Sequence, residues 1–330
     1  MKPSLPEITV IVPNYNGRAV LSACLDSLAR QQRLPAAVIV VDNGSRDDSR
    51  ELAERHPLKP SWIGFPHNRG FAAAVNAGIH ASETPALALL NNDAAADPRW
   101  LLAGARGILR HPQAAIFASL VLRREERDRV DSAGDAYARD GRPRPRGRAC
   151  RAAEFDRACE TFSASAGAAF FRRRLFEEVG PFDESFFAYL EDVDLGFRSR
   201  LLGHRCVFLP EAVVYHQGAA TQLGDRPGRK PEDSGQRVRW IARNKLFVLG
   251  QNLPARLLFH WAPDIADGLL RSAGYHLLCS RQFPAFLAGT LEGLLGLPRR
   301  CSKRRALQAR RQVSLAELKR MILLGAWPCP

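Results

Sequence analysis

Short apolar runs alternate with polar loops along the N-terminal third of the chain. Four runs of β-branched and other apolar residues stand out: Ile8 to Val12, Val38 to Val41, Trp62 with Ile63, and Ala86 to Leu90. Such runs are typical of strands that are buried on both faces of a parallel sheet. Between the first two runs, Leu21, Leu25 and Leu28 fall on one stripe of a helix. The alternation predicts an α/β protein with a doubly wound, mostly parallel central sheet flanked by helices.

The middle of the chain resumes this pattern after a charged interruption. Arg123 to Glu160 holds 11 basic and 9 acidic residues, so we expect a surface loop or hairpin rather than a nucleic-acid-binding arm. The pattern then predicts a short helix over Arg172 to Val179, a helix over Glu191 to Leu202, and two short strands, Val207 to Leu209 and Ala212 to Tyr215. In the second helix Val193, Phe197 and Leu201 recur at four-residue spacing.

Beyond about Gln236 the sequence becomes rich in leucine, tryptophan and arginine. Five apolar residues form a helical stripe: Leu257, Leu258, Trp261, Ile265 and Leu269. Pro263 falls inside this stripe, and we expect it to kink the helix. We therefore predict one domain over residues 1–236 and a basic, amphipathic helical region over residues 237–330.

Composition and charge narrow the class of protein. The 330 residues are 46% hydrophobic, which is enough for a sizeable core. The formal net charge is +14, and most of it lies beyond Gln236, where 16 Lys and Arg face 4 Asp and Glu. Such an asymmetry indicates a polyanionic partner, either an anionic membrane surface or a nucleic acid.

The cysteine pattern and the hydropathy predict the compartment. The seven cysteines are scattered, without a Cys-x-x-Cys pair, and this is typical of a reduced, cytoplasmic protein. The chain runs from Met-Lys-Pro directly into a predicted core strand, so we expect no signal peptide. The charge-free stretches Leu246 to Ala255 and Gln282 to Leu291 fall short of the roughly 18 apolar residues of a spanning helix. We expect a cytoplasmic protein, either free or peripheral on the inner face of the cell membrane.

Polar residues follow the predicted strands at one edge of the sheet, which is where open α/β sheets bind ligands. Asp93, after the fourth strand, is either a turn residue that bonds the backbone or a ligand of Mg²⁺. Mg²⁺ needs only one or two protein carboxylates when a pyrophosphate supplies other oxygens. Asp42, after the second strand, stands where a ribose or base contact is usual, although any loop Asp fits there. His216, taken alone, is more often structural than a ligand.

Glu191, Asp192 and Asp194 occupy the first turn of a predicted helix. Because the apolar stripe lies elsewhere, we expect these carboxylates to face away from the core. They either complement the helix dipole, with an Asp194 to Arg198 pair at i, i+4, or carry chemistry. The aromatic residues just before them favour a cleft wall: Phe182, Phe186, Phe187 and Tyr189.

Five ordered blocks resemble the family 2 glycosyltransferases, and within them the branch of rhamnosyltransferases of cell-surface polysaccharide assembly. The blocks are Ile-Val-Pro-Asn-Tyr-Asn-Gly at 11–17, Val-Val-Asp-Asn-Gly-Ser-Arg-Asp at 40–47, Asn68-Arg-Gly-Phe71 with Asn76-Ala-Gly78, Leu90-Asn-Asn-Asp93, and Gly180 to Arg198 closed by Tyr215-His216. The succession is more specific than any single block. The resemblance implies a GT-A type, Rossmann-like fold, a nucleotide-diphosphate sugar donor, a Mg²⁺ or Mn²⁺ ion, and transfer with inversion.

Carried over by position, the resemblance assigns roles to single residues. Asp192 matches the general base and Glu191 its catalytic neighbour. Asp93 matches a metal ligand of the family's Asp-x-Asp motif, and His216 the position that completes the metal site. The first acidic position of that motif is Asn91 here, so metal affinity would rest on Asp93, His216 and the pyrophosphate. The expected nucleotide-sugar contacts are Pro13, Tyr15, Asn16, Asp42, Asn43, Ser45, Asn68, Gly70, Phe71, Asn76, Asn91 and Asn92.

The resemblance also implies a cellular role. We expect transfer to a glycan or lipid-linked glycan on the cytoplasmic side, with dTDP-rhamnose as the first donor to test. Residues 1 to about 120 would form the nucleotide-sugar half, and about 121–236 the acceptor half. The basic C-terminal region would either lie on anionic lipid or form an ordinary helical cap with a solvated basic face.

Three other functions stay open at this point. A sugar-phosphate nucleotidyltransferase also uses an α/β sheet and a metal, but no Gly-rich, Lys-containing phosphate loop follows the first predicted strand. A nucleic-acid-binding protein would use the seven basic residues of Arg299 to Arg311 and show steeply salt-dependent affinity. Aromatic residues for base stacking are sparse around that run, so nucleic acid is the weaker partner. A non-catalytic transferase is favoured only by Asn91.

Overall fold

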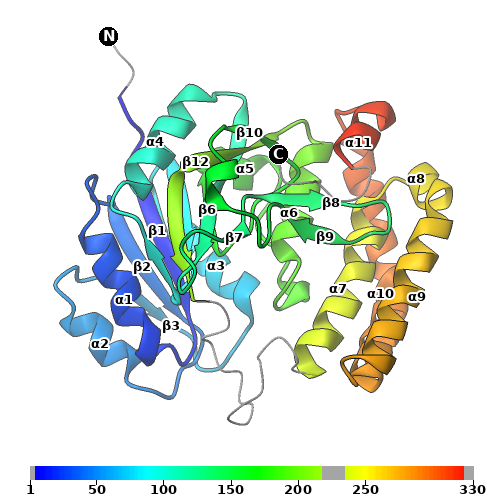
Figure 1. The fold of residues 1–330 in the computed structure, drawn as a ribbon, viewed down its shortest axis with the longest axis horizontal. Helices are drawn as coiled ribbons and strands as arrows, with labels where there is room; N and C mark the ends of the chain where they lie inside the picture. Colours follow the sequence, from blue (N-terminus) through cyan, green and yellow to red (C-terminus); the bar gives the residue numbers. More distant parts are fainter. Residues whose placement is uncertain (1–3, 218–234, 323–330) are drawn as a thin grey trace.

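A ten-stranded mixed sheet forms the centre of the computed structural model, which describes residues 4–217 and 235–322 (Figure 1). The strand order is β10-β12-β6-β11-β4-β1-β2-β3, with β5 pairing β12 and β7 pairing β6. The strands are β1 (Ile8–Asn14), β2 (Ala37–Asp42), β3 (Ser61–Gly64), β4 (Ala86–Leu90), β5 (Ala94–Ala96), β6 (Ala114–Arg123), β7 (Val130–Ser132), β10 (Cys159–Thr161), β11 (Ala168–Arg172) and β12 (Arg205–His216), beside a separate hairpin of β8 (Asp135–Tyr137) and β9 (Pro143–Pro145). All four strands predicted in the N-terminal third are confirmed.

Strands β1 to β4 form the parallel half of the sheet, as the alternation of strands and helices predicts. The other half is mixed, because β11 is antiparallel to both β4 and β6 while β12 is parallel to β6. The predicted doubly wound parallel sheet therefore holds for β1 to β4 but not for the strands beyond β4. The two short strands predicted after Leu202 are a single strand, β12, whose register shifts between Leu209 and Val213. Pro210, which has no N–H for the ladder, lies at this shift.

Helices cover both faces of the sheet (Figure 1). They are α1 (Arg18–Ala29), α2 (Ser49–Arg55), α3 (Phe71–Ala81), α4 (Trp100–Arg110), α5 (Arg173–Glu178) and α6 (Glu191–Leu201), with 3-10 turns η1 (Ala152–Glu154) and η2 (Glu184–Phe186). One core cluster joins a sheet face to α1 and α4, and a second joins the opposite face to α3 and α5. Alternate residues of β1 enter the two clusters, Val10 the first and Ile11 the second. This is why the strand sequence is continuously apolar.

The charged segment Arg123–Glu160 contains the predicted hairpin, formed by β8 and β9. It is not confined to the surface, because Asp135, Asp140 and Arg146 are buried. Asp140 accepts a hydrogen bond of 2.6 Å from Arg142 Nε. Balanced charge in the sequence thus corresponds in part to ion pairs inside the fold.

Five helices form the described part of the C-terminal region: α7 (Gly235–Asn252), α8 (Ala255–His260), α9 (Ala262–Leu278), α10 (Phe283–Ala309) and α11 (Leu315–Met321). Helix α7 packs on the sheet domain, and its Phe247 shares a third core cluster with Phe197 of α6. Helix α10 runs along α7 so closely that a Cβ on Gly289 would meet the backbone oxygen of Arg239 at 2.1 Å. The helical C-terminal region is therefore confirmed, and it is packed against the rest of the fold.

Pro263 begins a helix instead of kinking one. The predicted stripe is buried at Leu257 and Trp261, but α8 ends at His260 and α9 begins at Ala262. Pro263 lies in the first turn of α9, where its missing N–H would have no helical partner. The prediction of one kinked helix is wrong for this reason.

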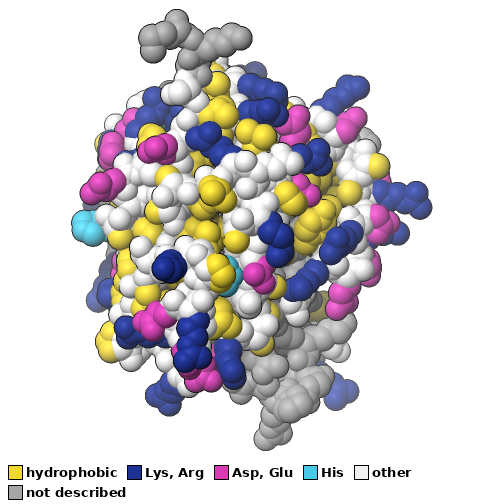
Figure 2. All heavy atoms as spheres, turned by 90° about the vertical axis from the view of Figure 1, so that its left-hand side faces the viewer, with side chains coloured by type: hydrophobic (Ala, Val, Ile, Leu, Met, Phe, Trp, Pro, Cys, Tyr) yellow, Lys and Arg dark blue, Asp and Glu magenta, His cyan; other side chains and the backbone are white. Residues whose placement is uncertain are grey.

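Charges of both signs are interspersed on the side of the molecule that carries α1 and α2 (Figure 2). This balance of charge agrees with the sequence, in which most of the excess of Lys and Arg lies beyond Gln236 and outside α1 and α2. In residues 4–217 and 235–322, no helix is both long and apolar enough to cross a bilayer.

Asp183 joins the loop before α6 to the C-terminal helix α10. Its Oδ2 accepts hydrogen bonds from Lys303 Nζ at 2.6 Å and from Arg300 Nη1 at 3.2 Å. Its Oδ1 accepts one from Ser185 Oγ at 2.6 Å. Burial alone would raise the pKa of Asp183, but these bonds and the two positive charges lower it to about 2.

We expect the stability of the fold to depend on the ionisation of Asp183. Its folded-state pKa of about 2 lies below the ordinary Asp pKa of about 3.9. The stability that ionised Asp183 contributes is therefore fully present above about pH 3.9 and is lost as the pH falls toward 2. In urea titrations, Asp183→Asn should lower the free energy of unfolding by about 2 kcal/mol at neutral pH and by much less near its folded-state pKa. As a control, Glu54→Ala removes an exposed pair with Arg50 and should cost less than about 1 kcal/mol. Equal losses for the two variants at neutral pH would contradict this assignment.

Candidate active site

Asn14 joins the carboxyl ends of three neighbouring strands. Its Nδ2 donates to Asp42 Oδ1 at 2.9 Å, and its Oδ1 accepts from Asn92 Nδ2 at 2.8 Å. The backbone N–H and the hydroxyl of Ser45 donate to Asp42 as well. A Cβ on Gly17 would lie 2.2 Å from both atoms of the Asn14–Asn92 bond, so a larger residue there would displace this bond. The predicted contacts Asp42, Ser45 and Asn92 therefore meet at one sheet edge.

The loops that follow β1 and β2 lie against each other. The backbone N–H of Asn16 donates to Ser45 Oγ at 2.7 Å, and Asn16 Oδ1 accepts from the backbone N–H of Arg46 at 2.9 Å. Pro13 is still part of β1, and Tyr15 follows that strand, half-buried. The structure thus brings Pro13, Tyr15 and Asn16 to the same edge as Asp42.

Asn43 holds the loop that precedes α3. Its Nδ2 donates to the carbonyl of Gly70 at 2.9 Å, and its Oδ1 accepts from the N–H of Arg69 at 2.7 Å. Asn68 Oδ1 accepts from the N–H of Gly70 at 2.9 Å, and Phe71 begins α3. The predicted contacts Asn43, Asn68, Gly70 and Phe71 form one turn next to the end of β2, and their contact with a nucleotide stays a prediction.

Asn76 of α3 binds the loop before α6. Its Oδ1 accepts from the N–H of Phe182 at 3.0 Å, and its Nδ2 donates to the carbonyl of Phe182 at 2.9 Å. Because both ends of the amide are bonded to Phe182, Asn76 links α3 to the loop before α6. Its predicted contact with a nucleotide sugar is not tested by these bonds.

His216 lies between two carboxylates at the end of β12. Its Nε2 is 3.3 Å from Asp93 Oδ1, and its Nδ1 is 3.0 Å from Asp131 Oδ2. Burial alone would lower the pKa of His216, but the hydrogen bonds and charges of Asp131 and Asp93 raise it to about 10. The hydrogen bond from His216 lowers the pKa of Asp131. The predicted metal ligands Asp93 and His216 are thus direct neighbours.

Two buried oxygens lie next to this histidine. Asn91 Oδ1 has no hydrogen-bond partner among the described residues, and Asp93 Oδ1 has only the 3.3 Å ion pair with His216 Nε2. A cavity of about 50 Å³ opens between Asn91, Asp131, Ser165 and His216. In the described part of the chain, no group of three or more His, Cys, Asp or Glu side chains is arranged to hold a metal by itself. A cation here would therefore need further ligands from a substrate.

Residues 165–167 connect Asp192 to the metal side of the site. Asp192 Oδ2 accepts a hydrogen bond from the N–H of Ala166 at 3.0 Å. The carbonyl of the next residue, Gly167, accepts one from the N–H of Asn91 at 2.9 Å. The side chain predicted to act as the base and the backbone of the predicted metal motif therefore bind adjacent residues of one segment.

Two further carboxyl groups affect Asp192. Burial raises the pKa of Asp192, and hydrogen bonds from the N–H groups of Ala166 and Val193 offset this in part. Burial first, and then the charge of Asp192, raise the pKa of Glu191 and of Asp135. Glu191 Oε2 is buried and accepts no hydrogen bond from the described residues. Such a cluster favours retention of protons over full ionisation.

The loop before α6 has an unusual backbone. Phe187, Tyr189 and Leu190 have φ angles of 65°, 69° and 68°. For residues other than glycine this conformation costs of order 1–3 kcal/mol each, and it persists only where surrounding contacts impose it. Asn244 of α7 supplies such contacts, because its Nδ2 lies 3.0, 2.9 and 2.7 Å from three carbonyl oxygens of the loop.

The four aromatic residues predicted as a cleft wall divide into two pairs. Phe182 and Phe186 are buried in the core. Phe187 and Tyr189 are half-buried and pack on Trp240 of α7, with ring centroids 4.8 and 6.3 Å away. An aromatic cluster of Phe187, Tyr189 and Trp240 therefore lies just before the helix that carries Asp192.

The expectation that the first-turn carboxylates of α6 face away from the core is wrong for Glu191 and Asp194, which are buried. Asp194 Oδ2 accepts from Arg198 Nε at 2.8 Å, which confirms the predicted i, i+4 pair. Its Oδ1 accepts from the side chains of Gln251 and Asn252. Helix α7 covers this face of α6, and the periodicity of α6 alone does not reveal that.

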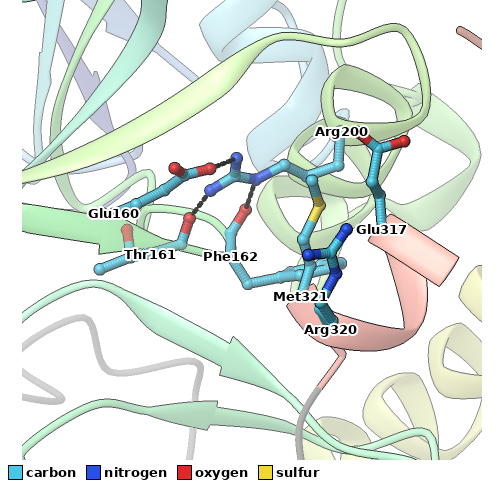
Figure 3. Close-up of a pocket in the computed structure, with 7 residues that line it drawn as sticks. All are labelled: Glu160, Thr161, Phe162, Arg200, Glu317, Arg320 and Met321. Carbon is cyan, nitrogen blue, oxygen red and sulfur yellow. Dashed lines mark hydrogen bonds and ion pairs between the residues drawn. The ribbon is translucent and has the colours of Figure 1, made fainter. Parts of the chain in front are cut away.

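A second, larger cavity of about 320 Å³ is formed by β10, α6 and α11 (Figure 3). Arg200 extends along its wall and donates to the carboxylate of Glu160 and to the carbonyls of Thr161 and Phe162. No residue predicted for the active site lines this cavity. The contacts of Arg200 hold β10 against α6, which is a structural role.

Three residues of the site were not predicted from the sequence: Asn14, Asp131 and Asn244. Asn14 ends the first strand, and that position was the available signal. Asp131 lies inside the charge-dense segment and shows no distinguishing pattern. Asn244 lies in a helix whose apolar and basic residues indicate only amphipathicity.

Comparisons with known proteins agree with this architecture. A model of glycosyl transferase family 2 matches residues 9–180, and one of glycosyl transferase family group 2 matches residues 148–297. The chain is 29% identical over 241 residues to the N-acetylglucosaminyl-diphospho-decaprenol L-rhamnosyltransferase of Mycobacterium tuberculosis, covering 64% of this chain and 76% of that protein. It is 33% identical over 91 residues to the uncharacterized glycosyltransferase EpsJ of Bacillus subtilis, and the match spans 26% of the length of EpsJ.

Solved structures share the fold at low sequence identity. The mannosyltransferase PcManGT of Pyrobaculum calidifontis, in complex with GDP-Man and Mn²⁺, matches with a TM-score of 0.54 at 20% identity, covering 92% of this chain and 86% of that one. S. aureus TarS 1-349 in complex with UDP-GlcNAc matches with a TM-score of 0.55 at 18% identity, covering 92% and 90%. These likenesses identify the GT-A type fold. Because the first family model covers more than half of the residues, the chain belongs to glycosyl transferase family 2 and is a glycosyltransferase.

Proposed function

We propose that the protein is an inverting glycosyltransferase that moves a sugar from a nucleotide-diphosphate sugar to a hydroxyl group of a glycan or lipid-linked glycan. The observation that carries this proposal is the 165–167 segment, which binds both Asp192 and Asn91. Asp192, the base in this proposal, is thereby linked to the turn after β4 that carries Asp93. One-step inversion requires a base and a leaving group on opposite faces of the sugar. A sugar bound between Asp192 and a diphosphate near Asp93 would meet this requirement.

Asp192 serves as the general base in this proposal. It takes the proton of the acceptor hydroxyl while that oxygen bonds to the anomeric carbon, and the bond to the nucleotide diphosphate breaks. Burial raises the pKa of Asp192, which brings its basicity closer to neutral pH, where a base is most effective. Such a base contributes roughly 10²- to 10⁴-fold in rate. No covalent intermediate with the protein is required.

A divalent cation, Mg²⁺ or Mn²⁺, fits the residues around Asp93. Asn91 Oδ1 is a buried oxygen without a hydrogen-bond partner among the described residues, and Asp93 Oδ1 is a buried carboxylate oxygen paired only with His216; oxygen ligands are those that these ions prefer. Asp93 and His216 would hold the ion, with His216 giving up its Nε2 proton as the ion binds, and Asp131 would keep its bond to Nδ1 of His216. When bound, the ion stabilises the charge on the departing diphosphate. PcManGT, which was solved with Mn²⁺, supports the use of a divalent metal.

The donor and acceptor classes are inferred from relatives. The mycobacterial relative is named as a rhamnosyltransferase of N-acetylglucosaminyl-diphospho-decaprenol, so dTDP-rhamnose and a lipid-linked glycan are the first substrates to test. PcManGT and TarS were solved with GDP-Man and UDP-GlcNAc, so the same fold accepts different nucleotides. The cluster of Phe187, Tyr189 and Trp240 offers aromatic surface on which an acceptor sugar can pack.

Helix α10 supports contact with the cytoplasmic face of an anionic membrane. Its residues Leu287, Leu291 and Leu294 recur on one helical face and are 44%, 51% and 49% exposed. Arg299 and Arg305 follow in the same helix, exposed and without an ion pair among the described residues. Exposed leucines enter the lipid boundary, and each basic residue near anionic lipid adds about 1 kcal/mol. Such a contact would bring the site to a lipid-linked acceptor.

Asp192→Asn should abolish transfer while retaining donor binding. The amide keeps the shape of the carboxylate but cannot accept the proton, so we expect turnover to fall by roughly 10²- to 10⁴-fold. Transfer is measured as release of nucleotide diphosphate, and donor binding by calorimetry. The matched control is Asp264→Asn, an exposed substitution in α9, which should retain activity. Turnover of Asp192→Asn close to that of the wild type would remove Asp192 as the base.

Asp93→Ala should remove the dependence of donor binding on metal. The wild type should bind the nucleoside diphosphate of its donor more tightly with Mn²⁺ than with EDTA, because a bound ion would attract the negatively charged diphosphate. Calorimetry of Asp93→Ala should show the same weak affinity under both conditions. Asp156→Ala, an exposed carboxylate removed elsewhere, should behave as the wild type. Unchanged Mn²⁺-dependent affinity in Asp93→Ala would contradict the assignment.

Replacing two exposed leucines of α10 should weaken membrane binding. In pelleting assays with vesicles that contain anionic lipid, Leu291→Gln combined with Leu294→Gln should lower binding at least about tenfold, since each buried leucine contributes roughly 1.5–3 kcal/mol. Leu34→Gln removes a leucine that is 65% exposed in the N-terminal part of the chain and should have no effect. Equal binding of both variants would leave α10 as a helical cap with a solvated basic face.

A further inference from the structure

We propose that Asn244 of α7 is a positioning residue for glycosyl transfer, because its amide holds the loop before α6 in the backbone conformation that places Asp192. This inference rests on the proposed role of Asp192 as the base. It assigns a part in the reaction to a C-terminal helix that lies outside the residues matched by the glycosyl transferase family 2 model.

The amide of Asn244 bonds to the loop along most of its length. Nδ2 donates to the carbonyl oxygens of Phe186, Ala188 and Tyr189 at 3.0, 2.9 and 2.7 Å. Oδ1 accepts a hydrogen bond from Arg243 Nε at 2.9 Å, which fixes the orientation of the amide. Asn244 is 0% exposed, so water does not compete for these bonds.

The opposite side of the loop binds the donor half of the site. The carbonyl of Phe187 accepts a hydrogen bond of 3.4 Å from the N–H of Ala72, in the first turn of α3. A Cβ on Gly70 would lie 2.5 Å from the same carbonyl oxygen. The loop is therefore held between α3 and α7, and the turn predicted to contact the nucleotide lies directly against it.

The conformation of this loop determines where α6 begins. Leu190 precedes the helix with φ 68° and ψ 4°, in the left-handed region. Its carbonyl accepts a hydrogen bond of 2.9 Å from the N–H of Asp194, which closes the first turn. Asp192 lies in that turn, and its carboxylate meets Ala166 only with the turn in this place. A loop that relaxed to negative φ would rotate the start of α6.

The chemistry of the contact selects asparagine. Three carbonyl oxygens converge on Nδ2, which shares its two hydrogens among them and accepts no hydrogen bond. Aspartate at this position would turn an acceptor toward the same three oxygens. With alanine the carbonyl of Phe186 would keep its bond from Arg243 Nη2 at 2.7 Å, but the carbonyls of Ala188 and Tyr189 would lose the bonds from Asn244, and the loop would relax to restore hydrogen bonding. Neither replacement preserves the left-handed backbone.

The test compares Asn244→Ala with a matched buried amide. Gln31 is also buried, donates through Nε2 to two backbone carbonyls and accepts one N–H through Oε1, but it joins α1 to the segment around α4. Gln31→Ala should lower stability without changing the turnover of the folded enzyme. Asn244→Ala should lower kcat by roughly 10- to 100-fold, the scale expected for a displaced catalytic group, with little change in the KM for donor.

Amide hydrogen exchange supplies a readout that does not depend on activity. In Asn244→Ala the amides of residues 186–191 should exchange faster than in the wild type, while those of β1 to β4 should not. Adding Leu190→Gly should recover part of the lost turnover, because glycine adopts positive φ without strain. A merely stabilising contact would show no such rescue.

Two outcomes overturn the inference. One is exchange at residues 186–191 that is unchanged in Asn244→Ala, and the other is a kcat equal to that of Gln31→Ala once the folded fraction is taken into account. If the wild type transfers no sugar from any nucleotide-sugar donor, the proposed function fails. The exchange measurement then still decides whether Asn244 holds the loop.

Discussion

The backbone of residues 165–167 forms hydrogen bonds with both elements that carry the candidate chemistry. Its Ala166 N–H reaches Asp192 on α6, and its Gly167 carbonyl reaches the Asn91 N–H after β4. These elements are far apart in the sequence, and no local pattern brings them together. In the proposed mechanism, the distance between Asp192 as the base and a diphosphate held near Asp93 would depend on this short segment, which leads into β11, the antiparallel strand between β4 and β6. This departure from a purely parallel sheet brings α6 next to the end of β4.

Buried polar side chains carry the remaining connections between the parts of the site. Asn14 joins the ends of β1, β2 and β4, and Asp194 joins α6 to α7 through Gln251 and Asn252. In a low-dielectric interior a satisfied network of this kind is rigid, whereas a broken one is costly. Helix α7 is therefore joined to α6 by buried hydrogen bonds and a shared core cluster. The division of the chain into two regions at about residue 236 stays a prediction from the change in composition there. The third core cluster contains residues from both sides of that position.

The sequence predicted those parts of the fold that depend on local pattern. The four parallel strands and the helix from Glu191 follow from apolar runs and four-residue spacing, and the structure contains them with bounds shifted by a residue or two. The strand ends predicted the edge at which Asp42, Asn92 and Asp93 meet. Asp131 could not be predicted, because its partner His216 lies 85 residues away. The burial of Asp194 could not be predicted either, since it depends on α7, whose own periodicity says nothing about α6.

In the proposed site a base and a metal-held diphosphate share one edge of the sheet. Anomalous diffraction from crystals grown with Mn²⁺ and a bound nucleoside diphosphate is the sharpest test of this arrangement. We expect one manganese peak within ligand distance of Asp93 Oδ1 and His216 Nε2, with the diphosphate on the ion and the carboxylate of Asp192 facing it across the space for the sugar. A diphosphate bound at the ends of β1 and β2 with manganese located away from Asp93, or with Asp192 turned out of the site, would contradict it.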